Sequence, residues 1–153
     1  MKVEVSVMLI SPREAVWNNL KDFASVQNYH PTVTSSTRLN DKVTGIGAER
    51  SCTFNDGNTI LERIIDYYEG DHYVVDIFDM GKMPLKSAQA IVGIRMGVDG
   101  LAELFMSMEF KAKFGPLGWV MERMMMAKMF KRLMLSILNG LNAYSKTGVP
   151  VAS

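Results

Sequence analysis

The C-terminal part of the chain most constrains the fold, because Leu117–Lys146 contains no proline and favours one long helix. At about 100° per residue, one stripe of this helix is apolar and consists of Trp119, Met126, Phe130, Leu133, Ile137, Leu141 and Tyr144. The opposite side carries Lys128, Lys131, Arg132, Asn139, Asn142 and Lys146. Since a helix in a protein gains most of its stability from packing, the apolar stripe is predicted to lie on a sheet.

The residues before this helix predict strands. Lys2–Ile10 alternates apolar and polar side chains with the period of a strand that has one buried face. Six further strands are predicted at Val33–Leu39, Ala48–Phe54, Thr59–Tyr68, Tyr73–Asp79, Leu85–Val98 and Ala102–Ala112. Turn sequences such as Asn55–Asn58 separate these strands, which indicates an antiparallel meander.

Two short helices are expected between the first two strands. Ser11, Pro12 and Glu14 form the pattern of a capping box, with Pro12 at the first helical position. The second segment, Ser25–Pro31, is predicted to be a short helical turn that ends at His30, because Pro31 disfavours helical backbone in the preceding residue.

Composition and motifs exclude several classes of function. The chain has 17 Lys and Arg against 16 Asp and Glu, so its field offers no broad surface for nucleic acid. A single cysteine, Cys52, and an N-terminus without a continuous apolar segment lead us to expect a cytoplasmic protein. No cluster has the spacing of metal ligands and no nucleotide-binding glycine motif is present, so we expect neither a metal nor a cofactor.

The order of these elements resembles the START-like (SRPBCC) superfamily, and bacterial polyketide cyclase/dehydrase-like proteins in particular. Three motifs carry the resemblance: Ser11–Phe23, Gly45–Gly47 with Arg50, and Leu61–Ile64. The resemblance implies an α+β helix-grip fold, in which a curved seven-stranded antiparallel sheet surrounds the long C-terminal helix and two short N-terminal helices accompany it. It also implies one ligand-binding domain over residues 1–146, a tail over residues 147–153, and a cavity between the sheet and the long helix.

Arg50 and Glu62 are the leading candidates for the site. Arg50 shares the inward face of its strand with Cys52 and Phe54, and Glu62 shares a face with Ile60 and Ile64. A buried arginine needs a carboxylate, which is either Glu62 itself in a structural pair or the acidic group of a ligand. Glu62 is alternatively a general base, although spacing implies no second catalytic group.

Further ligand-binding residues are expected around this pair. His30 follows Tyr29 near the expected mouth of the cavity, where a surface or capping role is favoured over donation to a ligand. The full predicted set is Arg50, Glu62, Cys52, Phe54, Ile60, Tyr29, His30, Met126 and Phe130.

Methionine is frequent at the start of the long helix, where the apolar surface extends beyond one stripe. The residues concerned are Leu117, Val120, Met121, Met124 and Met125. They either pack beneath neighbouring loops or form a contact with a second copy or a membrane surface.

The leading functional prediction is binding or carriage of a hydrophobic or amphipathic small molecule such as a lipid, isoprenoid or polyketide. The alternatives are a polyketide cyclase, aromatase or dehydratase, and an interaction module that uses the methionine-rich segment.

Overall fold

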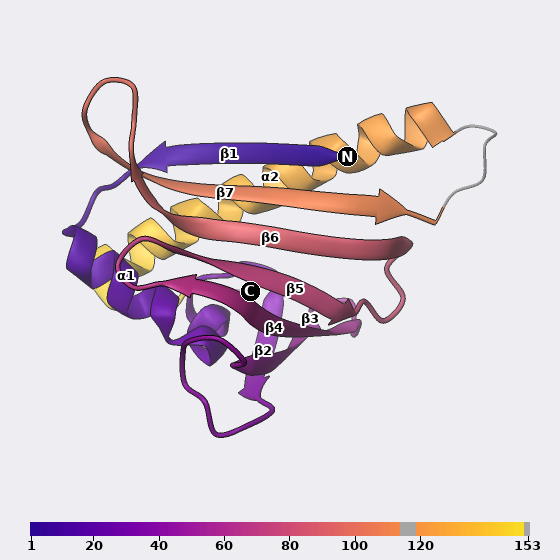
Figure 1. Cartoon of the computed structure of the whole chain (residues 1–153), viewed down its shortest axis with the longest axis horizontal. Helices are drawn as coiled ribbons and strands as arrows, with labels where there is room; N and C mark the ends of the chain where they lie inside the picture. The colour runs from indigo at the N-terminus through magenta and orange to yellow at the C-terminus, as the bar shows by residue number, and fades with distance from the viewer. Residues whose placement is uncertain (114–118, 152–153) are drawn as a thin grey trace.

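Seven strands build one antiparallel sheet in the computed structural model, which describes residues 1–113 and 119–151 and, of residues 119–123, the backbone alone. The strands are β1 (Lys2–Met8), β2 (Val33–Arg38), β3 (Glu49–Phe54), β4 (Thr59–Tyr68), β5 (His72–Asp79), β6 (Leu85–Met96) and β7 (Ala102–Ala112). Their order in the sheet is β1-β7-β6-β5-β4-β3-β2 (Figure 1). Each strand from β2 to β7 pairs with its neighbour in sequence, and β1 pairs with β7. The predicted meander is therefore confirmed.

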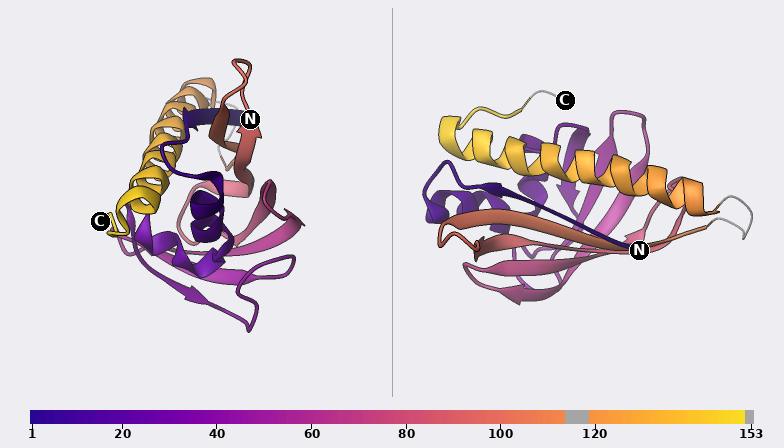
Figure 2. Two further views of the ribbon diagram at one scale, coloured as in Figure 1. Left: turned by 90° about the vertical axis from the view of Figure 1, so that its left-hand side faces the viewer. Right: turned by 90° about the horizontal axis from the view of Figure 1, so that it is seen from above.

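The helices lie on the inner side of the curved sheet. They are α1 (Arg13–Lys21), the 3₁₀ helix η1 (Phe23–Asn28) and α2 (Trp119–Thr147). Figure 2 shows the curvature of the sheet, with α2 running along its open side and α1 beside the C-terminal half of α2. A hydrogen bond from Asn19 Nδ2 to Ser145 Oγ links α1 to α2. The predicted α+β helix-grip architecture is confirmed.

Several element ends differ from the prediction. The first strand ends at Met8, not Ile10, and β5 begins at His72, one residue before the predicted start at Tyr73. Pro12 has an extended ψ of 141° and forms the N-cap of α1, so the helix begins one residue later than the capping box requires. Ser11 therefore lies outside the capping position, and the N-cap has no side-chain hydrogen bond.

The apolar side of α2 is broader than the predicted stripe. Met134 and Leu138 lie outside the predicted stripe but are fully buried, as Leu141 is. Asn142 was predicted to face solvent, and this prediction is wrong. Its side chain is buried, donates to the carbonyl oxygen of Met8 over 2.8 Å and accepts from the backbone N–H of Ile10 over 3.4 Å. These bonds satisfy backbone groups where β1 ends.

A glycine in the middle of α2 permits close contact with the end of η1. A Cβ atom on Gly140 would lie 2.1 Å from the carbonyl oxygen of Tyr29. The helix can therefore approach the Tyr29 backbone only with glycine at this position. This contact fixes Tyr29 and the following His30 against the inner side of α2.

Candidate functional site

Arg50 and Glu62 form a buried ion pair across neighbouring strands. They are direct partners in the β3–β4 register, and Arg50 Nε donates to Glu62 Oε1 over 2.9 Å. Each residue is only 8% exposed. The predicted inward orientation and pairing of these residues are confirmed.

The guanidinium group of Arg50 has further partners from η1. Its NH1 group donates to the carbonyl oxygen of Phe23 over 2.7 Å, and its central carbon lies 3.8 Å from the centre of the Phe23 ring. Burial acts to lower the pKa of Arg50, but the adjacent Glu62 carboxylate outweighs burial and the pKa lies above its usual range. Arg50 is therefore a permanent cation, held by an acid, a carbonyl and an aromatic face.

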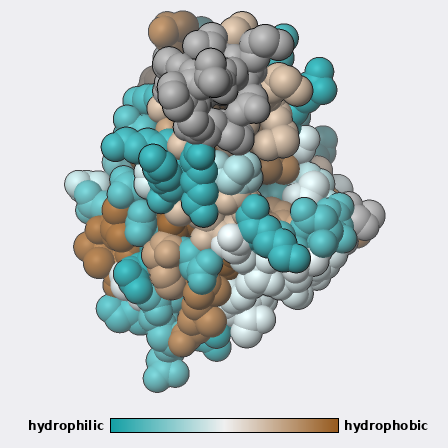
Figure 3. Space-filling view, turned by 90° about the vertical axis from the view of Figure 1, so that its right-hand side faces the viewer, coloured by the Kyte–Doolittle hydropathy of each residue, from teal (hydrophilic) through white to brown (hydrophobic). Residues whose placement is uncertain are grey.

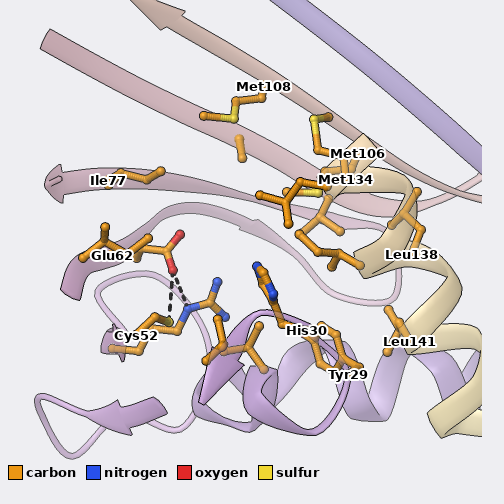
Figure 4. Close-up of a pocket in the computed structure, with 18 of the residues that line it drawn as sticks. Tyr29, His30, Cys52, Glu62, Ile77, Met106, Met108, Met134, Leu138 and Leu141 are labelled. Carbon is orange, nitrogen blue, oxygen red and sulfur yellow. Dashed lines mark hydrogen bonds and ion pairs between the residues drawn. The ribbon is translucent and has the colours of Figure 1, made fainter. Parts of the chain in front are cut away.

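Cys52 lies next to Arg50 on the inner face of β3 and contributes a second hydrogen bond to the carboxylate. Its thiol lies 3.4 Å from Glu62 Oε1, as the dashed lines in Figure 4 show. Burial, with the nearby Glu62 charge, raises the pKa of Cys52 to about 12, although Arg50 opposes this change. The thiol is therefore a protonated donor and not a nucleophile near neutral pH.

His30 is buried, which contradicts the preference for a surface histidine. It is 7% exposed, and its ring extends into the pocket in Figure 4. The ring also packs edge-on against Phe54, with 5.7 Å between the ring centres. Burial lowers the pKa of His30 to about 4, with Glu62 opposing and Arg50 supporting this shift. The surface prediction failed because the bend after η1, where Gly140 admits the backbone, directs this side chain inward.

Two buried tyrosines complete the polar end of the site. The Tyr73 hydroxyl donates to the carbonyl oxygen of Leu20 over 3.0 Å, and its ring packs edge-on against Phe23. Burial raises the pKa of Tyr29 to about 12 and places that of Tyr73 well above its usual value. Both side chains are therefore neutral, so Arg50 and Glu62 are the charged groups at this end.

A cavity of about 100 Å³, measured as the space open to the centres of water-sized molecules, lies between these groups, the sheet and α2. At about 10–15 Å³ for each water on this measure, it has room for roughly seven to ten water molecules. Its walls are mainly aliphatic and include four methionines: Met83, Met106, Met108 and Met134. Helix α2 contributes Phe130, Leu133, Met134, Ile137, Leu138 and Leu141.

Most predicted site residues line this cavity. They are Tyr29, His30, Arg50, Cys52, Phe54, Ile60, Glu62 and Phe130. Met126 is buried but does not line it, because it lies one helical turn before Phe130, the first residue of α2 at the cavity. The sequence analysis missed Tyr73 and the methionines of β7, Met106 and Met108. Their alternation along β7 could have indicated an inward face, but not that this face borders a cavity.

Of the described methionines near the start of α2, Met126 is buried and the other three are exposed. Met124, Met125 and Met129 are 58%, 69% and 54% exposed. Leu117 and the side chains of Val120 and Met121 lie outside the described residues. The end of the molecule where α2 begins is seen in Figure 3, and on this face hydrophobic patches are separated by hydrophilic side chains.

The described residues hold neither a metal-binding cluster nor a membrane-spanning helix. Within residues 1–113 and 119–151, no group of three or more His, Cys, Asp or Glu side chains is placed to hold a metal ion. No helix in the same part of the chain is long and apolar enough to cross a membrane.

Comparisons with known proteins agree on one family and one fold. Residues 1–146 match the family model described as polyketide cyclase/dehydrase and lipid transport. The Zhui aromatase/cyclase from Streptomyces sp. R1128 has a similar structure, with a TM-score of 0.78, 14% identity, and coverage of 95% of this chain and 93% of that chain. The protein XoxI from Bacillus cereus is also similar, with a TM-score of 0.76, 18% identity, and coverage of 95% and 96%. No curated protein sequence matches the chain.

Proposed function

Because the chain belongs to the polyketide cyclase/dehydrase and lipid transport family, we propose that it binds a small, mainly apolar molecule in the cavity between the sheet and α2. The observation that carries the proposal is the composition of the cavity wall. Aliphatic and methionine side chains form most of the wall, Glu62 and His30 extend into the pocket (Figure 4), and Arg50 contacts Glu62. Ligand sites in proteins combine an apolar enclosure with a few polar groups in this way.

The four methionines support a cavity that adapts to its ligand. Methionine has three rotatable bonds and a polarisable sulfur, so it can repack around different shapes at low cost. The unliganded space suits a molecule with roughly ten non-hydrogen atoms, by the same water-equivalent measure. A longer chain requires these side chains to move aside.

Filling the cavity from its wall tests the proposal. Ala90 lines the cavity from β6, whereas its neighbour Gln89 is exposed on the other face of the strand. Ala90→Phe should abolish binding of naphthalene, measured by calorimetry, and Gln89→Leu should leave it unchanged. Equal binding by wild-type protein and the folded Ala90→Phe variant would place the ligand elsewhere and contradict the proposal.

A second candidate function is an enzyme of the cyclase or dehydratase kind, which the approach of Glu62 and His30 to one cavity favours. Glu62 would remove a proton from the carbon next to a ligand carbonyl, while His30 would donate a hydrogen bond to the carbonyl oxygen. The wild-type protein should then accelerate exchange of deuterium into the methyl group of 2-acetylnaphthalene, and Glu62→Gln should not. Without acceleration, the binding function stands alone.

The outer side of α2 supports a further part of the proposal, contact with an anionic lipid surface. Exposed Met124, Met125 and Met129 alternate with exposed Lys128, Lys131 and Arg132, and residues 124–147 contain no acidic side chain. Such a face complements anionic headgroups, into which methionines insert while lysines reach phosphates. A second copy of the same face would be repelled by its like charges.

Liposome flotation tests this contact. The wild-type protein should float with anionic vesicles and not with neutral ones, and the double variant Met124→Gln and Met125→Gln should remain in solution. Met96→Gln is the matched control, because Met96 is an exposed methionine on β6, outside this face. A wild-type protein that ignores vesicles, or that dimerises through this face in light scattering, would contradict the proposed lipid contact.

A further inference from the structure

Glu62 and His30 each have one polar side-chain atom at the polar end of the cavity without a hydrogen-bond partner among the described residues. Glu62 Oε1 accepts hydrogen bonds from Arg50 and Cys52, but no hydrogen bond reaches Glu62 Oε2. His30 Nε2 also has no hydrogen bond, whereas His30 Nδ1 is hydrogen-bonded to Thr32. Within the described part of the chain, Thr44 Oγ1 is the one polar side-chain atom of a non-exposed residue that is inaccessible to solvent and lacks a hydrogen-bond partner. Oε2 and Nε2 therefore retain accessible surface. Since both residues line the cavity, that surface faces the ligand space.

The hydrogen bonds of His30 establish which of its nitrogens carries the proton. The backbone N–H of Thr32 donates to Nδ1 over 3.2 Å, so Nδ1 is the acceptor. In a neutral imidazole the proton then lies on Nε2. The ring extends into the pocket in Figure 4, and Glu62 lines the same pocket, so the cavity contains one fixed donor and one fixed acceptor.

The charges at this end are already balanced. Arg50 is the cation and Glu62 the anion, and their contact of 2.9 Å neutralises both. Arg50 also donates to Phe23, while Tyr29, Tyr73, Cys52 and His30 are neutral near pH 7. A carboxylate in the cavity would add an uncompensated negative charge: Arg50 Nη2 donates to no described residue, but the Arg50 charge is already balanced by Glu62, a second carboxylate beside it. Burial of such an unpaired charge is strongly unfavourable.

We infer that the cavity selects a neutral ligand whose O–H or N–H group donates to Glu62 Oε2 and whose oxygen accepts from His30 Nε2, and that it rejects the corresponding carboxylates. This inference rests on the proposed binding function and specifies its ligand class. Of the two alternatives left open for Arg50, a structural pair with Glu62 and an acidic ligand, the inference takes the first, because Glu62 already contacts Arg50.

Four probes with one ring system separate the contributions: naphthalene, 2-naphthol, 2-naphthamide and 2-naphthoate. The amide and the carboxylate have the same shape and differ in charge. By calorimetry at about pH 7.5, 2-naphthol should bind about tenfold more tightly than naphthalene, since a hydrogen bond to a charged group is worth at least that factor. The amide should bind at least about tenfold more tightly than the carboxylate. Equal or tighter binding of 2-naphthoate would overturn the inference.

The failure of this inference is distinguishable from failure of the proposed function. If all four probes bind with similar affinity, the cavity binds apolar molecules but lacks the proposed selectivity. If none binds, naphthalene included, the proposed function fails and the inference fails with it. The wild-type protein alone decides between these outcomes.

Glu62→Gln provides a second test with an opposite sign. This substitution leaves the Arg50 charge uncompensated, so the preference should invert and 2-naphthoate should bind about tenfold more tightly than 2-naphthamide. Met96→Leu, an apolar change at an exposed position on β6 outside the cavity, should keep the wild-type preference and serves as the control. A folded Glu62→Gln protein that still prefers the amide would show that Glu62 does not set the selectivity.

Discussion

Arg50 and Glu62 illustrate how single residues in this protein combine a structural and a binding role. One oxygen of Glu62 stabilises Arg50 within the apolar interior, and the other borders the cavity. A buried ion pair of this kind is costly to break, because removal of one partner leaves an uncompensated charge. The same pair can therefore fix the local structure and present a neutral polar surface to a ligand.

A double-mutant cycle measures the structural part of this role. Arg50→Met should lower the free energy of unfolding by about 3–5 kcal/mol, because Glu62 is left buried and unpaired. Adding Glu62→Leu should recover much of that loss, since apolar residues replace buried ion pairs at little cost. Chemical denaturation gives these values. Additive losses in the double variant would show that the two side chains do not depend on each other.

The depressed pKa of His30 predicts a pH-dependent stability. The unfolded histidine takes up a proton near its ordinary pKa of 6.5, whereas the folded one does so only near 4. As the pH falls from 6.5 towards 4, proton uptake by the unfolded histidine therefore favours the unfolded state. At higher pH this destabilisation of the folded protein is absent. From about pH 7.5 to about pH 5 the free energy of unfolding should fall by about 2 kcal/mol through His30.

The variant His30→Asn isolates this contribution, because asparagine keeps an acceptor for Thr32 but does not titrate. The difference in unfolding free energy between the wild-type protein and this variant should change by the stated amount across the same pH range. A difference that stays constant would mean that His30 is not buried in its neutral form.

Among the elements, α2 approaches the backbone of the N-terminal part of the chain closely at Gly140. Alanine is a better helix former than glycine by about 1 kcal/mol, so Gly140→Ala would stabilise an exposed helix. Here the added Cβ would lie 2.1 Å from the Tyr29 carbonyl oxygen. We expect Gly140→Ala to lower the free energy of unfolding by about 1–3 kcal/mol, the usual cost of overpacking.

The neighbouring exposed residue offers a control for this prediction. Asn139→Ala makes a similar gain in helix propensity at a position that faces solvent, and should not destabilise the protein. Chemical denaturation of both variants gives the comparison. If Gly140→Ala proved as stable as Asn139→Ala, α2 would have room to shift away from Tyr29.

The strands were more predictable from sequence than the long helix. A strand has two faces, so alternation alone placed Arg50, Cys52 and Glu62 inward. A helix that contacts several elements has no single buried stripe, and the burial of Asn142 depends on where β1 ends. His30 was misjudged for a similar reason, since its direction follows from a bend that η1 and Gly140 determine together.

For the whole molecule, element order and three motifs were enough to predict the fold and, through the family resemblance, a cavity between the sheet and α2, but not the size or the full lining of that cavity. A cavity is what packing leaves unfilled, and it depends on the relative positions of β7, the loop at Met83 and α2. The abundance of methionine suggested adaptable surfaces, yet sequence could not separate the methionines around the cavity from those on the outside of α2. The structure separates these two groups and so provides internal reporters for ligand binding.

Methyl NMR of protein labelled at its methionine methyl groups tests the central claim most directly. On titration with 2-naphthol, the signals of Met106, Met108 and Met134 should shift, because these side chains line the cavity. Those of the exposed Met96, Met124 and Met125 should stay in place. Shifts confined to the exposed methionines, with the three cavity signals unchanged, would contradict the account of an internal ligand site.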